Sequence, residues 1–138
     1  MKYTEWIEND VPEGIKKDPL WDLELYRKAL FLSDAAWLDC EKLIKDPLGK
    51  AIAHQLVRSA GSVAANMEEG YGRGYGKDYA RFLKIALGSA RETRGWYFRG
   101  RALIDEAVYN HRIKEYDSLI AGLVVISKQQ SRYKKPSA

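Results

Sequence analysis

Apolar side chains recur every three or four residues over most of the chain, the spacing that places them on one face of an α-helix. In the first such segment Leu23, Tyr26, Leu30, Trp37 and Leu43 follow this period. No stretch shows the alternation of apolar and polar residues that is typical of a strand. The pattern therefore predicts four helices, at about residues 20–44, 48–69, 77–104 and 111–131.

Signals for helix starts and stops separate these four segments. Asp18-Pro19 and Asp46-Pro47 each place a capping residue before a proline suited to the first helical position. Glycine then occupies every second position from 70 to 76, which predicts the end of one helix and a reversal into the next. Short connections between long helices favour an all-α fold, an antiparallel up-down four-helix bundle over residues 19–131. A polar N-terminal arm at 1–18, ordered in part through Trp6 and Ile7, and a basic tail at 132–138 flank it.

Charge is distributed unevenly along the chain, whose formal net charge is +4. Residues 1–24 hold seven acidic side chains against three lysines, whereas residues 70–101 hold eight Lys and Arg against two acids. Residues 128–138 add four cations and no acid. This asymmetry favours a polyanionic partner, and it is equally compatible with contact between the acidic and basic parts of neighbouring subunits.

The third predicted helix carries its cations on one face. On a helical wheel they lie opposite a broad apolar arc and no acid lies among them; they are Lys77, Arg81, Lys84, Arg91 and Arg99. Such a row can replace the counterions of a phosphate backbone, or it can be a solvated surface. Arg73 and Tyr75 project from the glycine-rich turn and are candidates for contact with bases or sugars.

The second predicted helix carries a polar row beside a run of small residues. The row includes Gln55, Arg58, Ser62, Asn66 and Glu69. Small residues allow two helix backbones to approach closely, and the polar groups then need partners. The row therefore indicates either a tight helix pair within the chain or part of a subunit interface.

Motifs for catalysis and for nucleotide binding are absent from the sequence. Gly76-Lys77 fails the phosphate-loop spacing, because residue 71 is tyrosine and residue 78 is aspartate. His54 and His111 fall on different helices, and Cys40 is the single cysteine. We therefore expect no enzymatic activity, no metal and no cofactor. The first residues lack the pattern of a secretory signal and no apolar run is long enough for a membrane span, so a cytoplasmic location is expected.

The segment from Gln55 to Arg73, with the pattern Ser-x-x-x-Asn-x-x-Glu-Gly at 62–70, followed by Leu87-Gly88-Ser89, resembles a known family. It is the four-helix-bundle family named after proteins encoded in intervening sequences of 23S ribosomal RNA, which is similar in fold to the accessory proteins of diversity-generating retroelements. The resemblance covers roughly residues 20–130. Two positions depart from the family pattern, Ala64 where proline is usual and Glu68 where alanine is usual.

The resemblance implies a four-helix bundle assembled as a homo-oligomer, commonly a pentamer, with a basic surface for nucleic acid and no enzymatic activity. The family's motif positions, which the resemblance marks as interface or family-motif residues, map onto this chain at Arg58, Ser62, Asn66, Glu69, Gly70, Arg73, Phe82, Gly88, Ser89 and Glu92. Together with the basic row, it predicts a non-enzymatic oligomer that binds nucleic acid, RNA in preference to DNA. The alternative is a protein–protein adaptor or an accessory subunit of a nucleic-acid enzyme such as a reverse transcriptase.

Overall fold

The computed structural model describes residues 1–134, and the predicted tail at 132–138 lies mostly outside that range. The described residues form six α-helices and two short 3₁₀-helices and contain no strand, which confirms the all-α prediction and corrects the expected count of four helices. In chain order they are α1 Tyr3–Asn9, α2 Glu13–Lys16, η1 Pro19–Asp22, α3 Glu24–Leu43, α4 Pro47–Gly72, α5 Lys77–Arg99, η2 Arg101–Leu103 and α6 Glu106–Arg132.

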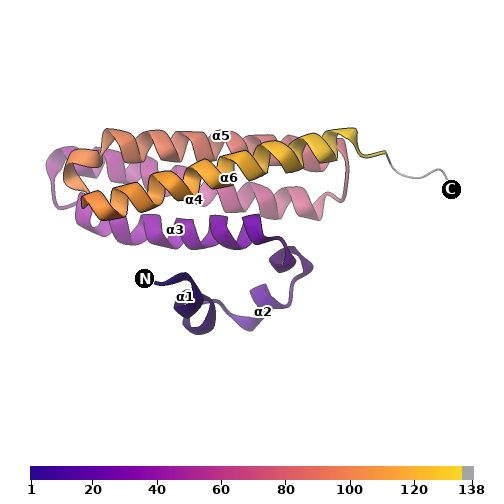
Figure 1. Ribbon diagram of the computed structural model, residues 1–138, viewed down its shortest axis with the longest axis horizontal. Coiled ribbons are helices and arrows are strands. Elements are labelled where there is room, and N and C mark those ends of the chain that lie inside the picture. Colours follow the sequence, from indigo (N-terminus) through magenta and orange to yellow (C-terminus); the bar gives the residue numbers. More distant parts are fainter. Residues whose placement is uncertain (135–138) are drawn as a thin grey trace.

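The four long helices α3, α4, α5 and α6 lie side by side, and each runs back along its predecessor (Figure 1). Their apolar faces meet in one core, which includes Leu32, Leu56, Met67, Leu83 and Leu123. These side chains are almost completely withdrawn from solvent, and each contributes about 1.5–3 kcal/mol relative to an exposed position. Burial of these faces therefore provides the main stabilisation of the helices.

Local sequence signals explain where several helices begin and end. The Asp46 carboxylate accepts hydrogen bonds from the backbone N–H groups of Leu48 and Gly49, at 2.8 and 3.1 Å, so the predicted start of α4 is correct. Asp18-Pro19 opens η1 instead of the long helix, so α3 starts at Glu24 and not near residue 20.

Three other predicted helix limits were wrong by several residues. Helix α4 continues to Gly72, beyond the expected end at 69. Helix α5 stops at Arg99 because the chain turns at Gly100 into η2, so the predicted end at 104 was too late. Helix α6 begins at Glu106, earlier than the predicted residue 111, and its first residues replace the expected loop at 105–110.

The N-terminal arm is helical and folds back on α3, where Figure 1 shows α1 and α2 beneath the long helices. Trp6 is only 2% exposed and packs with Val11 of the arm against Phe31 of α3. Its indole N–H donates to the Asp34 carboxylate at 2.7 Å. The hydrophobic pattern of so short a segment is too weak to predict a helix, and the contact with α3 stabilises it.

A buried polar cluster joins three of the long helices. Asp39 of α3 accepts a hydrogen bond from the Tyr97 hydroxyl of α5 at 2.6 Å and from the Arg112 Nε of α6 at 2.8 Å. Burial raises the pKa of the Tyr97 hydroxyl, and the hydrogen bonds to Asp39 hold the pKa of Arg112 above its ordinary value against the effect of burial. The cluster is therefore fully partnered and fixes how α3, α5 and α6 pack.

Candidate nucleic-acid interface

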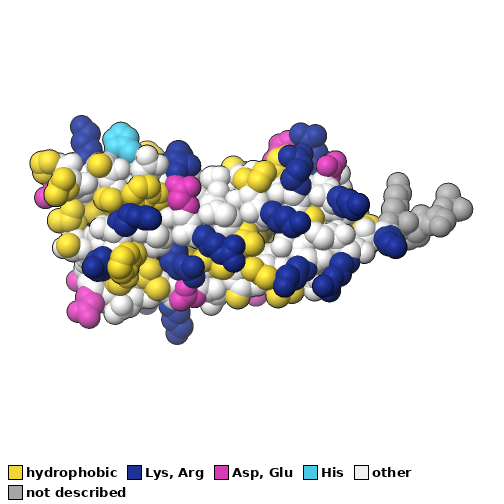
Figure 2. Space-filling model, turned by 90° about the horizontal axis from the view of Figure 1, so that it is seen from above, with side chains coloured by type: hydrophobic (Ala, Val, Ile, Leu, Met, Phe, Trp, Pro, Cys, Tyr) yellow, Lys and Arg dark blue, Asp and Glu magenta, His cyan; other side chains and the backbone are white. Residues whose placement is uncertain are grey.

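Helix α5 presents a row of exposed cations, the α5 basic face, defined by Lys77, Arg81, Lys84, Arg91 and Arg99. Among residues 1–134, no carboxylate lies within 4.0 Å of any of these five charged groups, whereas Arg94 on the flank pairs with Asp117 of α6 at 2.8 Å. In Figure 2, which views the molecule from the side of α5, Lys and Arg side chains extend along most of its length. The predicted row is therefore exposed and without acidic partners in the described chain.

Aromatic rings restrain two of these arginines. The Arg81 guanidinium lies 4.5 Å from the centre of the Phe82 ring, and that of Arg99 lies 4.8 Å from the Trp96 ring. A guanidinium held over a ring keeps its charge and most of its N–H donors available at the edge. These contacts restrict the conformations of the two side chains.

Three of these cations also border a hollow between α5 and the end of α6. Lys77, Arg81 and Lys84 lie along its α5 side, and Ser131 lies on the α6 side. The hollow has a volume of about 600 Å³ and an apolar floor of Ala80 and Ile85. An open, basic hollow of this kind suits an extended anionic chain better than a small enclosed ligand.

Arg73 differs from the α5 basic face in its partners. It ends α4, and its guanidinium pairs with Glu69 one turn earlier at 2.8 Å while lying 5.5 Å from the Phe82 ring centre. An exposed pair of this kind is worth at most about 1 kcal/mol and is easily exchanged for another anion. Its charge is nevertheless balanced by Glu69, whereas Lys84 has no carboxylate partner among residues 1–134.

Polar residues of α4 and α5, among them the motif residues Ser62 and Asn66, form what we call the α4–α5 seam (Ser59, Ser62, Asn66, Ser89 and Thr93). The Ser62 and Ser89 hydroxyls are 2.8 Å apart, and Asn66 donates to the Ser62 hydroxyl at 3.0 Å. The buried Thr93 hydroxyl lies 2.8 Å from that of Ser59. Of the polar row on the second helix, Ser62 therefore has a partner in α5 of the same chain, while Asn66 bonds to Ser62 within α4.

The remaining motif residues extend this seam towards both ends. Arg58 pairs with Glu92 and contacts Gln55, and Glu92 also accepts a hydrogen bond from the Trp96 indole at 2.9 Å. At the other end, a Cβ on Gly70 would lie 2.6 Å from the Phe82 Cβ, so the helices approach too closely there for any larger residue. Gln55, Arg58, Glu69 and Glu92 keep exposed surface, whereas Gly70 is buried.

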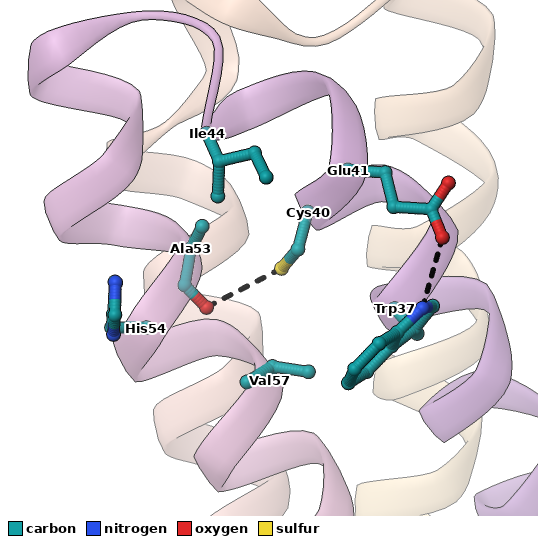
Figure 3. Close-up of a pocket in the computed structure, with 7 residues that line it drawn as sticks. All are labelled: Trp37, Cys40, Glu41, Ile44, Ala53, His54 and Val57. Carbon is teal, nitrogen blue, oxygen red and sulfur yellow. Dashed lines mark hydrogen bonds between the residues drawn. The ribbon is translucent and has the colours of Figure 1, made fainter.

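An apolar hollow of about 180 Å³ opens between α3 and α4 (Figure 3). Trp37, which is 60% exposed, Ile44 and Val57 line it, and the Cys40 thiol at its base donates to the Ala53 carbonyl at 3.4 Å. Burial, with a smaller effect of Asp39, raises the pKa of the Cys40 thiol to about 11, so the thiol stays protonated at neutral pH.

The same view shows that no catalytic pair is assembled there, because the His54 ring turns away from the thiol (Figure 3). Elsewhere in residues 1–134, no three His, Cys, Asp or Glu side chains gather in a group able to hold a metal ion. None of the helices in this range combines the length and apolar character needed to cross a bilayer.

Comparisons with known proteins give one family and one fold. The model of a family described as 23S rRNA-intervening sequence protein matches residues 21–124. The fold is similar to a crystal structure from Bacteroides thetaiotaomicron, a protein of unknown function from the S23 ribosomal protein family. That similarity has a TM-score of 0.69 and 24% identity, and it covers 75% of this chain and 98% of the other. No curated protein matches the chain. The family match begins after the arm, which is therefore an addition to the matched region.

Proposed function

The chain belongs to the 23S rRNA-intervening sequence protein family, and from this premise we propose that it is a non-enzymatic protein that binds nucleic acid, preferably RNA, through the α5 basic face. The observation that carries the proposal is the absence of acidic partners for Lys77, Arg81, Lys84, Arg91 and Arg99 within residues 1–134. The family name, which refers to ribosomal RNA, supports RNA over DNA.

The proposal includes the architecture that presents this face. We take α3, α4, α5 and α6 as an antiparallel up-and-down four-helix bundle, supported by their short connections and by the contact between the first and the last of them. In such a bundle each helix keeps one side for the core and one for solvent. The cations of α5 then lie on a rigid support, which favours binding without a loss of order.

Binding across a salt series tests the proposal. The purified protein is titrated into a labelled structured RNA and into duplex DNA at several salt concentrations. Phosphate contacts predict an affinity that falls steeply with salt, with a slope that grows with the number of contacts. The triple variant Arg81→Glu, Lys84→Glu, Arg91→Glu should lose binding while keeping its helical circular-dichroism spectrum and its melting temperature.

A matched variant controls for the change in net charge. Lys17, Lys45 and Lys50 are also exposed, and they lie in the arm, in the α3–α4 turn and at the start of α4. Their replacement by glutamate alters the net charge equally, but it leaves the α5 basic face intact. Equal loss of binding in both triple variants, or retained binding in the α5 variant, contradicts the proposed site.

We also propose that the protein is a homo-oligomer, for which the family resemblance implies a pentamer. The chain exposes Trp37 and Ile44, which line the hollow between α3 and α4, and it also exposes Phe98 near the end of α5 and Leu103 in η2. A second copy can cover the first pair with its own second pair in a head-to-tail contact, the geometry that closes into a ring. Light scattering tests this contact: Trp37→Asp and Phe98→Asp should each yield monomers, while Val125→Asp on α6 should not.

A second candidate function is that of an adaptor or accessory subunit of a nucleic-acid enzyme such as a reverse transcriptase. The observation in its favour is the exposed apolar hollow at Trp37, since such patches mark protein contacts. In this role the α5 basic face would bind an acidic protein surface. No binding to either nucleic acid even at low salt would favour the adaptor and exclude the primary proposal. The arm packs on α3 of its own chain, so it does not occupy the α5 basic face there.

A further inference from the structure

A hydrogen bond joins the turn between α4 and α5 to the C-terminal end of α6. Gly74 and Gly76 have φ values of 92° and 89°, a conformation that side-chain-bearing residues rarely adopt. This path lets the Gly76 N–H donate to the Gln130 side-chain carbonyl of α6 at 2.9 Å. The start of α5 and the end of α6 therefore lie beside each other.

That juxtaposition brings together two exposed aromatic rings. Tyr75 in the turn is 67% exposed and Tyr133, just after α6, is 43% exposed. Their ring centres are 5.5 Å apart, with an angle of 40° between the ring planes. Two large rings that contact each other and remain in water contribute little to the core, so their exposed faces are available for a ligand.

The two rings belong to residues that flank the lining of the basic hollow in the sequence. Tyr75 precedes Lys77 by two residues and Tyr133 follows Ser131 by two, and both of these neighbours line the hollow. Lys77, Arg81 and Lys84 then extend for about 10 Å along the helix axis. The aromatic pair and the row of cations therefore follow one another from the turn into the first two turns of α5.

We propose that this surface binds unpaired nucleotides of a single strand, with bases stacked on Tyr75 and Tyr133 and the following phosphates along Lys77, Arg81 and Lys84. This inference rests on the proposed nucleic-acid binding and specifies which form of the polymer is bound. Cations attract any phosphate chain, but exposed rings can stack only on bases whose faces are free. A duplex covers its base faces internally, so the tyrosines discriminate against it.

Fluorescence of a modified base tests the stacking directly. The probe is a 12-nucleotide RNA of non-pairing sequence that contains 2-aminopurine, whose emission changes when the base stacks; the same strand annealed to its complement and a DNA version are the comparisons. The wild-type protein should bind the single strand more tightly than the duplex and change the emission. The double variant Tyr75→Ala, Tyr133→Ala should bind the single strand about tenfold or more weakly and bind the duplex as the wild type does.

Matched variants separate stacking from other roles of the two residues. Tyr75→Phe with Tyr133→Phe keeps the rings and should bind as the wild type does. Val125→Ala truncates an apolar side chain of comparable exposure outside both this surface and the proposed subunit contact, and should change nothing. Tyr75→Ala alone tests the site if the double variant unfolds, because Tyr75 is the more exposed of the two.

The outcomes distinguish this inference from the function on which it rests. Equal affinity for single strand and duplex, an unchanged emission at saturation, or tyrosine variants that bind normally would each overturn the stacking site while leaving the α5 basic face in place. No binding to any probe at low salt would overturn the proposed function itself. A preference of the same site for the DNA strand would keep the stacking site and reassign the polymer.

Discussion

Polar groups on the two sides of α5 differ in whether they have partners within the chain. On the inner side Ser89, Thr93 and Tyr97 each have a hydrogen-bonding partner in α3 or α4. On the outer side the cations of the α5 basic face have no carboxylate partner within residues 1–134. Partnered groups on the inner side hold the helices in register, and unpartnered cations on the outer side remain available for a ligand. Mutations on the inner side should therefore change stability, and mutations on the outer side should change binding.

The largest effect on stability is expected from Asp39→Ala. The substitution leaves the mostly buried Arg112 cation and the Tyr97 hydroxyl without their acceptor, and a broken buried pair typically costs about 3–5 kcal/mol. Urea unfolding followed by circular dichroism measures this loss. Asp117→Ala, which breaks the exposed pair with Arg94, should cost less than about 1 kcal/mol. Similar losses in the two variants would contradict the distinction between inner and outer sides.

The same substitution, glycine to alanine, should lower the stability on the inner side and raise it on the outer side. Gly70→Ala places a methyl group 2.6 Å from the Phe82 Cβ, which cannot move without its backbone, and should cost about 1–3 kcal/mol. Gly88→Ala places its methyl in open space on the exposed side of α5, where alanine favours the helix by about 0.5–1 kcal/mol. Thermal unfolding should show a lower melting temperature for the first and a higher one for the second. Two shifts of the same sign would mean that the helix contact at Gly70 is less tight.

A smaller difference is expected between Ser62→Ala and Lys84→Ala. Ser62 pairs with Ser89 and accepts from Asn66, so its loss should cost about 1 kcal/mol. Lys84 has no carboxylate partner among the described residues, so its loss should change stability by less than about 0.5 kcal/mol and weaken RNA binding. Urea unfolding and RNA binding are measured on the same preparation of each variant. A Ser62→Ala protein that folds normally and binds RNA poorly would mean that the α4–α5 seam is part of the ligand site.

The raised pKa of the Cys40 thiol should have the smallest effect on stability at neutral pH. The rate at which a thiol reagent labels Cys40 measures this pKa better than unfolding does. With a pKa of about 11, its thiolate fraction at pH 8 is about a hundredfold below that of an ordinary cysteine, so labelling should be slow in the folded protein and fast in urea. The folded state retains this proton after the unfolded chain has lost it. The stabilisation from this group is therefore present below the ordinary pKa and is lost as the pH rises toward about 11. Rapid labelling of folded protein at pH 8 would contradict this.

The sequence predicted local features of the fold and missed contacts between distant residues. The helical period and the cap at Asp46 are properties of neighbouring residues, and the structure bears them out. The pair of Asp39 and Arg112 joins residues 73 positions apart, and only the packing of α3 against α6 brings them together. An acid within the apolar spacing between Ala36 and Leu43 is the one sequence signal that could have indicated it.

The candidate site shows the same division. A helical wheel is enough to place Lys77, Arg81 and Lys84 on one exposed face, because their separation along one helix fixes their directions. The pairing of Arg73 with Glu69 follows from a spacing of four residues and could have been predicted. The approach of Tyr133 to Tyr75 could not, because it depends on the path of a turn set by two glycines with positive φ.

The position of the arm bears on how the protein would be oriented as it approaches a polyanionic ligand. The arm, whose residues 1–18 hold five acids against three lysines, lies on the α3 side of the molecule, and α5, which carries the basic face, lies on the opposite side (Figure 1). Opposite charges on opposite sides give the molecule a permanent electric dipole across its short dimension. If the α5 basic face binds a polyanion as proposed, such a dipole would turn the protein before contact, so that α5 meets the polyanion first and the arm faces away. Under the proposed function, the arm would therefore increase the fraction of productive collisions without contacting the ligand itself.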